Sequence, residues 1–279
     1  MAMISMRFPE GKSKALTLSY DDGVETDIRL IEIMKAHGLK GTFNINSGCY
    51  SPEDKVYEEG EFFRRLSKSK VLETYGNSGM EIAVHGLTHT FLEQLPREIC
   101  TYEVLQDRLN LEEQFQTIVR GMAYPFGTFS DTVVDCLKAA GIVYSRTVTP
   151  SENFCIPTDW LRLNPTCHHR NSKLMDLAKQ FTEDNPQNKA PWLFYLWGHS
   201  YEFERDNNWY LIENFSEHMV KYSDIWHATN IEIYDYIQDY NRMRWSANGK
   251  TVYNPTNRIL YFLADGVPHA VGPGEMVFI

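Results

Sequence analysis

Apolar and polar positions along the chain follow two alternating patterns. Short, mostly apolar runs predict strands, and between them apolar residues recur every three or four positions, as in helices that bury one face. The predicted strands lie within residues 14–20, 41–46, 80–86, 120–127, 142–148, 160–169 and 191–200. The predicted helices cover residues 27–38, 61–75, 97–119, 130–141 and 172–184, and residues 230–242 are predicted as a closing strand-to-helix unit. About seven such repeats indicate parallel strands with helical crossovers, in a (β/α) barrel or a doubly wound sheet.

The pattern changes after residue 245. Pairs of residues that favour turns, such as Asn248-Gly249 and Asp265-Gly266, separate short apolar runs. We therefore expect two domains: a (β/α) domain over residues 1–245 and a small β-hairpin appendage over residues 246–279.

Composition narrows the classes of function. The formal net charge is -10, with 37 acidic and 27 basic residues and no block of Lys or Arg, which argues against nucleic-acid and anionic-membrane partners. The N-terminal apolar run stops at Arg7, too early for a signal-peptide core, and no apolar run approaches the ~20 residues of a membrane helix. We expect a cytoplasmic protein. The five cysteines are widely spaced without a CxxC pair, which fits reduced thiols better than a disulfide framework or a zinc ribbon.

Polar residues follow several predicted strands at the point where each strand ends. Asp21 and Asp22 end the first strand, His85 ends the third with His89 four positions later, and His199 follows a later strand. An Asp-Asp-Gly turn is common, and a lone HxxxH pair is often a solvated surface feature. Barrel enzymes, however, place their chemistry at the carboxyl ends of strands, and two histidines with a carboxylate often bind zinc. Together these residues predict a metal and acid–base site.

Five short motifs carry a resemblance to a known family. In order along the chain they are SYDDG, HGLTH, AYPFG, TDW and WGH, within residues 12–240. In residue types and order they resemble the motifs of the polysaccharide deacetylase family, the NodB-homology domain of carbohydrate esterase family four. The resemblance implies a distorted (β/α) barrel of about seven parallel strands and a metal-dependent hydrolase.

The resemblance also implies roles for individual residues. It implies that Asp22, His85 and His89 hold a divalent metal, which would be zinc, with cobalt, nickel or manganese as alternatives. Asp21 would be the general base that takes a proton from the attacking water. His199 would be the general acid that protonates the leaving amine.

Three further positions complete the implied site, and one departs from the family pattern. The backbone N–H of Phe126 would help to bind the oxyanion, and Asp159 would orient His199. The third motif of the family carries an arginine beside the base where this chain has Ala123. Arg146, at the end of the next strand, is the candidate substitute, although a structural or surface role is the alternative.

Other polar and aromatic residues leave alternatives open. His168 and His169 are adjacent on a predicted strand, so at most one should reach the site. Tyr201, Phe203 and Trp209, which follow His199, could stack on a sugar or belong to the core.

The function expected from the sequence is removal of an acyl group, N-acetyl in the simplest case, from a carbohydrate or a small acylated substrate. One alternative is a hydrolase of a non-peptide C–N amide in a small molecule on the same scaffold. Another is a catalytically idle carbohydrate-binding module. The sequence leaves the oligomeric state open.

Overall fold

The computed structural model describes residues 3–184 and 191–279 and is built around one parallel sheet. Its strand order is β6-β5-β4-β3-β2-β8-β7, with β9 also paired to the start of β2. The strands are β2 (Lys14–Asp21), β3 (Gly41–Ile45), β4 (Glu81–Val84), β5 (Gly121–Ala123), β6 (Tyr144–Arg146), β7 (Cys167–His168), β8 (Trp192–Gly198) and β9 (Ile225–His227). Every pairing registered between them is parallel. The predicted distorted (β/α) barrel of about seven parallel strands is confirmed.

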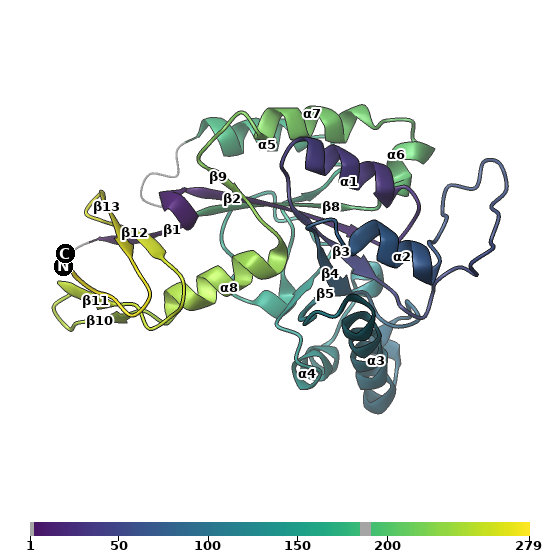
Figure 1. Ribbon diagram of the computed structural model, residues 1–279, viewed down its shortest axis with the longest axis horizontal. Coiled ribbons are helices and arrows are strands. Elements are labelled where there is room, and N and C mark those ends of the chain that lie inside the picture. Colours follow the sequence, from purple (N-terminus) through teal and green to yellow (C-terminus); the bar gives the residue numbers. More distant parts are fainter. Residues whose placement is uncertain (1–2, 185–190) are drawn as a thin grey trace.

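Helices cover the outside of the curled sheet (Figure 1). They are α1 (Asp27–Ala36), α2 (Lys68–Tyr75), α3 (Arg97–Phe115), α4 (Asp131–Ala139), α5 (Leu174–Glu183), α6 (Tyr201–Arg205), α7 (Tyr210–Met219) and α8 (Asn230–Asn241). Strand β2 is buried at every position, in the middle of the curled sheet, with β3 and β8 paired to its edges. A strand that is buried on both faces needs a nearly continuous apolar run, and this pattern is the one that predicted β2.

The predicted strand over residues 160–169 differs most from the structure. Residues 160–162 form a 3₁₀ turn, and only Cys167–His168 pair with β8. The carbonyl of Leu163 accepts the Thr147 N–H next to β6 at 2.9 Å, and the Thr166 N–H then donates to the Tyr195 carbonyl of β8 at 2.9 Å. This stretch crosses from one edge strand of the sheet to the other and so partly closes the barrel.

Several other elements were misplaced or missed. Residues 230–241 are helical throughout, and the strand of that unit lies earlier, at β9. Helix α2 begins at Lys68 instead of residue 61, and helices α6 and α7 were not predicted.

The C-terminal region forms two small antiparallel sheets, β10-β11-β14 and β1-β12-β13. Their strands are β1 (Ile4–Arg7), β10 (Arg244–Trp245), β11 (Thr251–Tyr253), β12 (Leu260–Ala264), β13 (Val267–Val271) and β14 (Met276–Phe278). Strand β1 comes from the other end of the chain, and both termini lie at this end of the molecule (Figure 1). The division into domains at residue 245 stays a prediction. Across residues 3–184 and 191–279, no helix combines the length and apolar character that spanning a bilayer requires.

Candidate active site

Most of the candidate residues line one cavity of about 590 Å³ at the carboxyl ends of the parallel strands: Asp21, Asp22, His85, His89, Phe126 and His199. Asp21 is the last residue of β2, and Asp22 follows it. His85 comes directly after β4, and His199 directly after β8. Parallel strands end at the same edge of the sheet, so residues far apart in the sequence face one space. Arg146 is the last residue of β6 and reaches Asp21.

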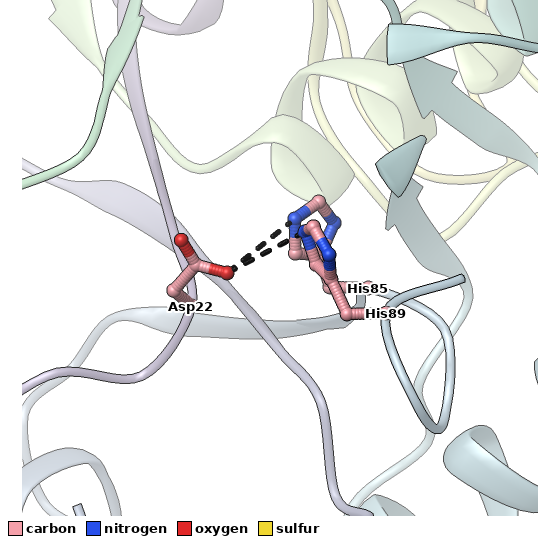
Figure 2. Close-up of side chains that lie close together, drawn as sticks. All are labelled: Asp22, His85 and His89. Carbon is pink, nitrogen blue, oxygen red and sulfur yellow. Dashed lines mark ion pairs between the residues drawn. The ribbon is translucent and has the colours of Figure 1, made fainter. Parts of the chain in front are cut away.

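Three side chains form a possible metal site. Figure 2 shows the Asp22 carboxylate facing the imidazoles of His85 and His89, with Oδ1 4.0 Å from Nε2 of His85 and 3.6 Å from Nε2 of His89. The Nδ1–H of His85 donates to the Ala123 carbonyl at 2.8 Å. The lone pair of neutral His85 is therefore on Nε2 and points toward Asp22, as in a metal-binding histidine. One carboxylate and two imidazoles suit a divalent transition metal, so these residues fit the implied ion.

Helix α3 holds the loop that carries the two histidines. The Asp107 carboxylate accepts the backbone N–H groups of His85 at 3.1 Å and Ser47 at 2.7 Å. One turn earlier, Glu103 accepts both the N–H and the hydroxyl of Thr88, at 2.9 and 2.8 Å. Both acids are buried. The two carboxylates therefore hold the backbone of this loop in place.

Three residues of the cavity other than glycine have left-handed backbone conformations. The φ angles are 84° at Asp22, 51° at His89 and 57° at Phe126. Such conformations are costly for residues other than glycine and cluster at functional sites. The Phe126 ring stacks on Phe91 at 3.9 Å and meets His89 edge-on at 4.5 Å. Phe126 thus lines the cavity, and the oxyanion role of its N–H stays a prediction.

Asp21 is held as an anion by its neighbours. Its Oδ2 pairs with the Arg146 guanidinium, and its Oδ1 accepts from Asn44 Nδ2 at 2.8 Å. Burial by itself raises the pKa of Asp21, but Arg146, His85, His199 and Asn44 lower it below its ordinary value. Arg146 is only 1% exposed, so the structure places it beside Asp21 and not at the surface.

His199 lies between the two aspartates of the cavity on one side and Glu202 on the other. Its Nε2 is 3.9 Å from Oδ2 of both Asp21 and Asp22, and its Nδ1 is 3.5 Å from Oε2 of Glu202. Burial lowers the pKa of His199, but Glu202, Asp21 and Asp22 raise it more, so the pKa lies above its ordinary value.

The expectation that Asp159 orients His199 is wrong. The carboxylate of Asp159 pairs with Arg162 at 2.6 Å and caps the Leu161 N–H at 3.0 Å. The 3₁₀ turn at residues 160–162 directs it into a different cavity. Glu202 takes the place beside His199, and its position three residues after His199, about one helical turn, was the signal in the sequence that could have found it.

Neither of the two adjacent histidines lines the cavity, which agrees with the expectation that at most one of them reaches the site. Nε2 of His168 and Nε2 of His169 lie 3.1 and 3.3 Å from Oε2 of Glu202. Both approach the same acid because β7 ends at His168 and the chain turns there, so strand alternation no longer applies. Of the downstream aromatics, Tyr201 lines the cavity while Phe203 packs in the core.

A curled parallel sheet with a carboxylate–histidine cluster at its carboxyl edge defines a (β/α) hydrolase-like scaffold with a possible metal centre. The sequence profile described as polysaccharide deacetylase matches residues 9–145. Over these residues the chain belongs to the polysaccharide deacetylase family. No curated protein matches the chain in sequence.

Three solved structures resemble the chain. A putative polysaccharide deacetylase from Mycobacterium smegmatis has a TM-score of 0.59 at 15% identity, over 85% of this chain and 94% of that one. A family 4 carbohydrate esterase from Streptomyces lividans, in complex with acetate, has a TM-score of 0.51 at 11% identity, over 77% and 91% of the two chains. The Streptococcus pyogenes deacetylase PplD, in complex with acetate, has a TM-score of 0.43 at 23% identity, over 52% of this chain and 61% of that one. The first two share the fold.

Proposed function

We propose that this protein is a metal-dependent hydrolase that removes an acyl group, N-acetyl in the simplest case, from a carbohydrate-like substrate. The observation that carries the proposal is the meeting of Asp21, the Asp22–His85–His89 cluster and His199 around one cavity. Family membership over residues 9–145 supports the same reaction class.

The proposed roles follow from charge and position. A divalent metal held by Asp22, His85 and His89, which we propose to be zinc, would acidify a water molecule and polarise the acyl oxygen. Asp21, kept ionised by Arg146, takes the proton of the attacking water. His199, on the same cavity, gives a proton to the leaving nitrogen. The Phe126 N–H would bind the oxyanion.

The cavity walls suit a sugar ring. Phe63, Trp197 and Tyr201 contribute aromatic rings to the lining. Such rings can also bind a small cyclic amide, so a non-peptide amide remains the second candidate substrate. An idle binding module is disfavoured because it would not need an ionised base and a histidine on the same cavity. A cytoplasmic location and the identity of the acyl group remain predictions.

The test uses release of acetate from N-acetylglucosamine oligosaccharides. Chelation should abolish the activity, and Zn²⁺ or Co²⁺ should restore it. Asp22→Asn should lose both metal and activity, whereas Asp159→Asn, a matched change outside the cavity, should keep both. Full activity in the metal-free protein would refute the proposed mechanism, and hydrolysis of small cyclic amides alone would favour the second candidate.

A further inference from the structure

The carboxylate of Glu202 lies at the centre of a group of histidines behind the active-site cavity. Its Oε2 lies 3.1 Å from Nε2 of His168, 3.3 Å from Nε2 of His169 and 3.5 Å from Nδ1 of His199. We call these four residues the Glu202 cluster. His199 Nδ1 is buried and has no hydrogen-bond partner among the described residues, and the Glu202 carboxylate at 3.5 Å is the acid that this atom faces.

The backbone fixes Glu202 under His199. Glu202 lies in the first turn of α6, and its N–H donates to the His199 carbonyl at 3.1 Å. Between them, the Ser200 hydroxyl donates to the buried Asp27 carboxylate at 2.5 Å, which anchors this turn to α1. Side chains three residues apart on a helical turn share a face. The acid and the imidazole therefore belong to one local unit.

On the side away from His199, the Glu202 carboxylate faces hydrogen-bond donors and positive charges. The Arg170 N–H donates to Nδ1 of His168 at 3.1 Å, so that nitrogen carries no proton and Nε2 does. His168 therefore presents an N–H to Glu202. The second carboxylate oxygen of Glu202, Oε1, lies 3.5 Å from Nη1 of Arg170 and 3.7 Å from Nη2 of Arg205.

This arrangement argues against a second metal ion. Nitrogen and oxygen atoms of His168, His169 and Glu202 lie close enough together to hold one. A metal-bound histidine, however, offers a lone pair and usually donates through its other nitrogen. His168 has the reverse arrangement, and two arginines already face the carboxylate. The cluster is built to hold a carboxylate in place.

We propose that Glu202 is the positioning residue for His199, accepting the Nδ1–H and leaving Nε2 as the atom that exchanges a proton with the substrate. The inference rests on the proposed function, because it assigns His199 the role of the acid. Nε2 faces Asp21 and Asp22, on the side of the ring where the substrate would lie. His168 and His169 keep the Glu202 carboxylate on the Nδ1 side.

The kinetic test compares two leaving groups. Glu202→Gln keeps the shape of the side chain but removes its charge. We expect kcat on an N-acetyl amide to fall by about 100-fold or more, with KM and metal content unchanged. On an aryl acetate, whose leaving group departs without a proton, the loss should be less than about 10-fold. Glu202→Asp should recover part of the amide activity, and Glu204→Gln, on the same helix, should behave as wild type.

A second measurement does not depend on activity. Nitrogen-15 NMR of His199 in the wild-type protein should show the proton of the neutral ring on Nδ1, and Glu202→Gln should lose that preference. A neutral ring protonated on Nε2 would overturn the proposal. So would equal losses on amide and ester, wild-type kcat in Glu202→Gln, or loss of a second metal equivalent in that variant. A wild-type protein that does not hydrolyse the amide would instead count against the proposed function, and the NMR result would still decide the role of Glu202.

Discussion

Asp21 and Asp22 are neighbours in sequence but face different partners. Asp21 ends an extended strand and points to Arg146 and Asn44. Asp22 has a φ of 84°, which turns its carboxylate toward His85 and His89. Two adjacent buried anions repel, and the pairing of Asp21 with Arg146 offsets part of that cost. The backbone at Asp22 thus divides the two carboxylates between two tasks.

This division predicts different results for two matched substitutions. Asp21→Asn should keep the metal and lose about 10²- to 10⁴-fold in kcat, because the amide cannot accept a proton from water. Asp22→Asn should lose the metal. Metal content and kcat, measured on the same preparations, check both. Loss of metal in Asp21→Asn with retention in Asp22→Asn would show that the roles are reversed.

Sequence motifs found the residues of the cavity better than the residues behind it. Asp21, Asp22, His85 and His199 stand at strand ends, where the apolar pattern itself marks their position. Asp159 was assigned from a three-letter motif, and such a motif does not say in which direction a turn points its side chain. Glu202 carries no motif of its own, and only the turn after β8 brings it under His199.

At the scale of elements, helix α3 acts on the metal loop through its buried face. Glu103 and Asp107 are one turn apart, and each accepts at least one backbone N–H from residues 85–88. A helix fixes the spacing of such acids more rigidly than a loop can. Partners of this kind behind metal ligands tune metal affinity.

Asp107→Asn should therefore weaken metal binding without removing a ligand. Asparagine can accept through only one oxygen, whereas Asp107 accepts from Ser47 and His85 on different oxygens. We expect the affinity for Zn²⁺ to fall about 10- to 100-fold. Competition with a chromophoric chelator measures it, and Glu113→Gln on the exposed face of α3 is the control. An unchanged affinity would mean that the loop holds its shape without α3.

Strand β2 and helix α3 were predicted, whereas strand β9 was missed and strand β7 was predicted as part of a much longer strand. The apolar patterns of strand β2 and helix α3 extend over many residues. Strand β7 has two residues and β9 has three, too few for a pattern. Strand β1 pairs with β12, about 250 residues away, and nothing local in the sequence indicates that partner.

At the scale of the whole molecule, Asp27 joins several elements around one buried carboxylate. It is fully buried and accepts from Ser200 before α6 at 2.5 Å, from Tyr75 of α2 at 2.6 Å and from the Val24 N–H at 3.2 Å. Burial raises the pKa of Asp27 from 3.8 to about 7, against the opposing effect of these hydrogen bonds. The folded protein therefore binds this proton more tightly than the unfolded chain does.

The free energy of unfolding should fall as pH rises between about 4 and about 7 because of Asp27. Below this window the carboxyl is protonated in both states, and above it the group is ionised in both, so its contribution is present at low pH and lost as pH rises. Between pH 5 and 7 the loss amounts to about 2 kcal/mol. Asp27→Asn has nearly the same size and cannot ionise, so its urea midpoint should fall less over this range, whatever its stability at pH 5. Both proteins should be measured with a chelator present, so that metal binding adds no pH dependence of its own. If the two proteins lose the same stability between pH 5 and 7, the Asp27 carboxyl does not carry the proton that we assign to it.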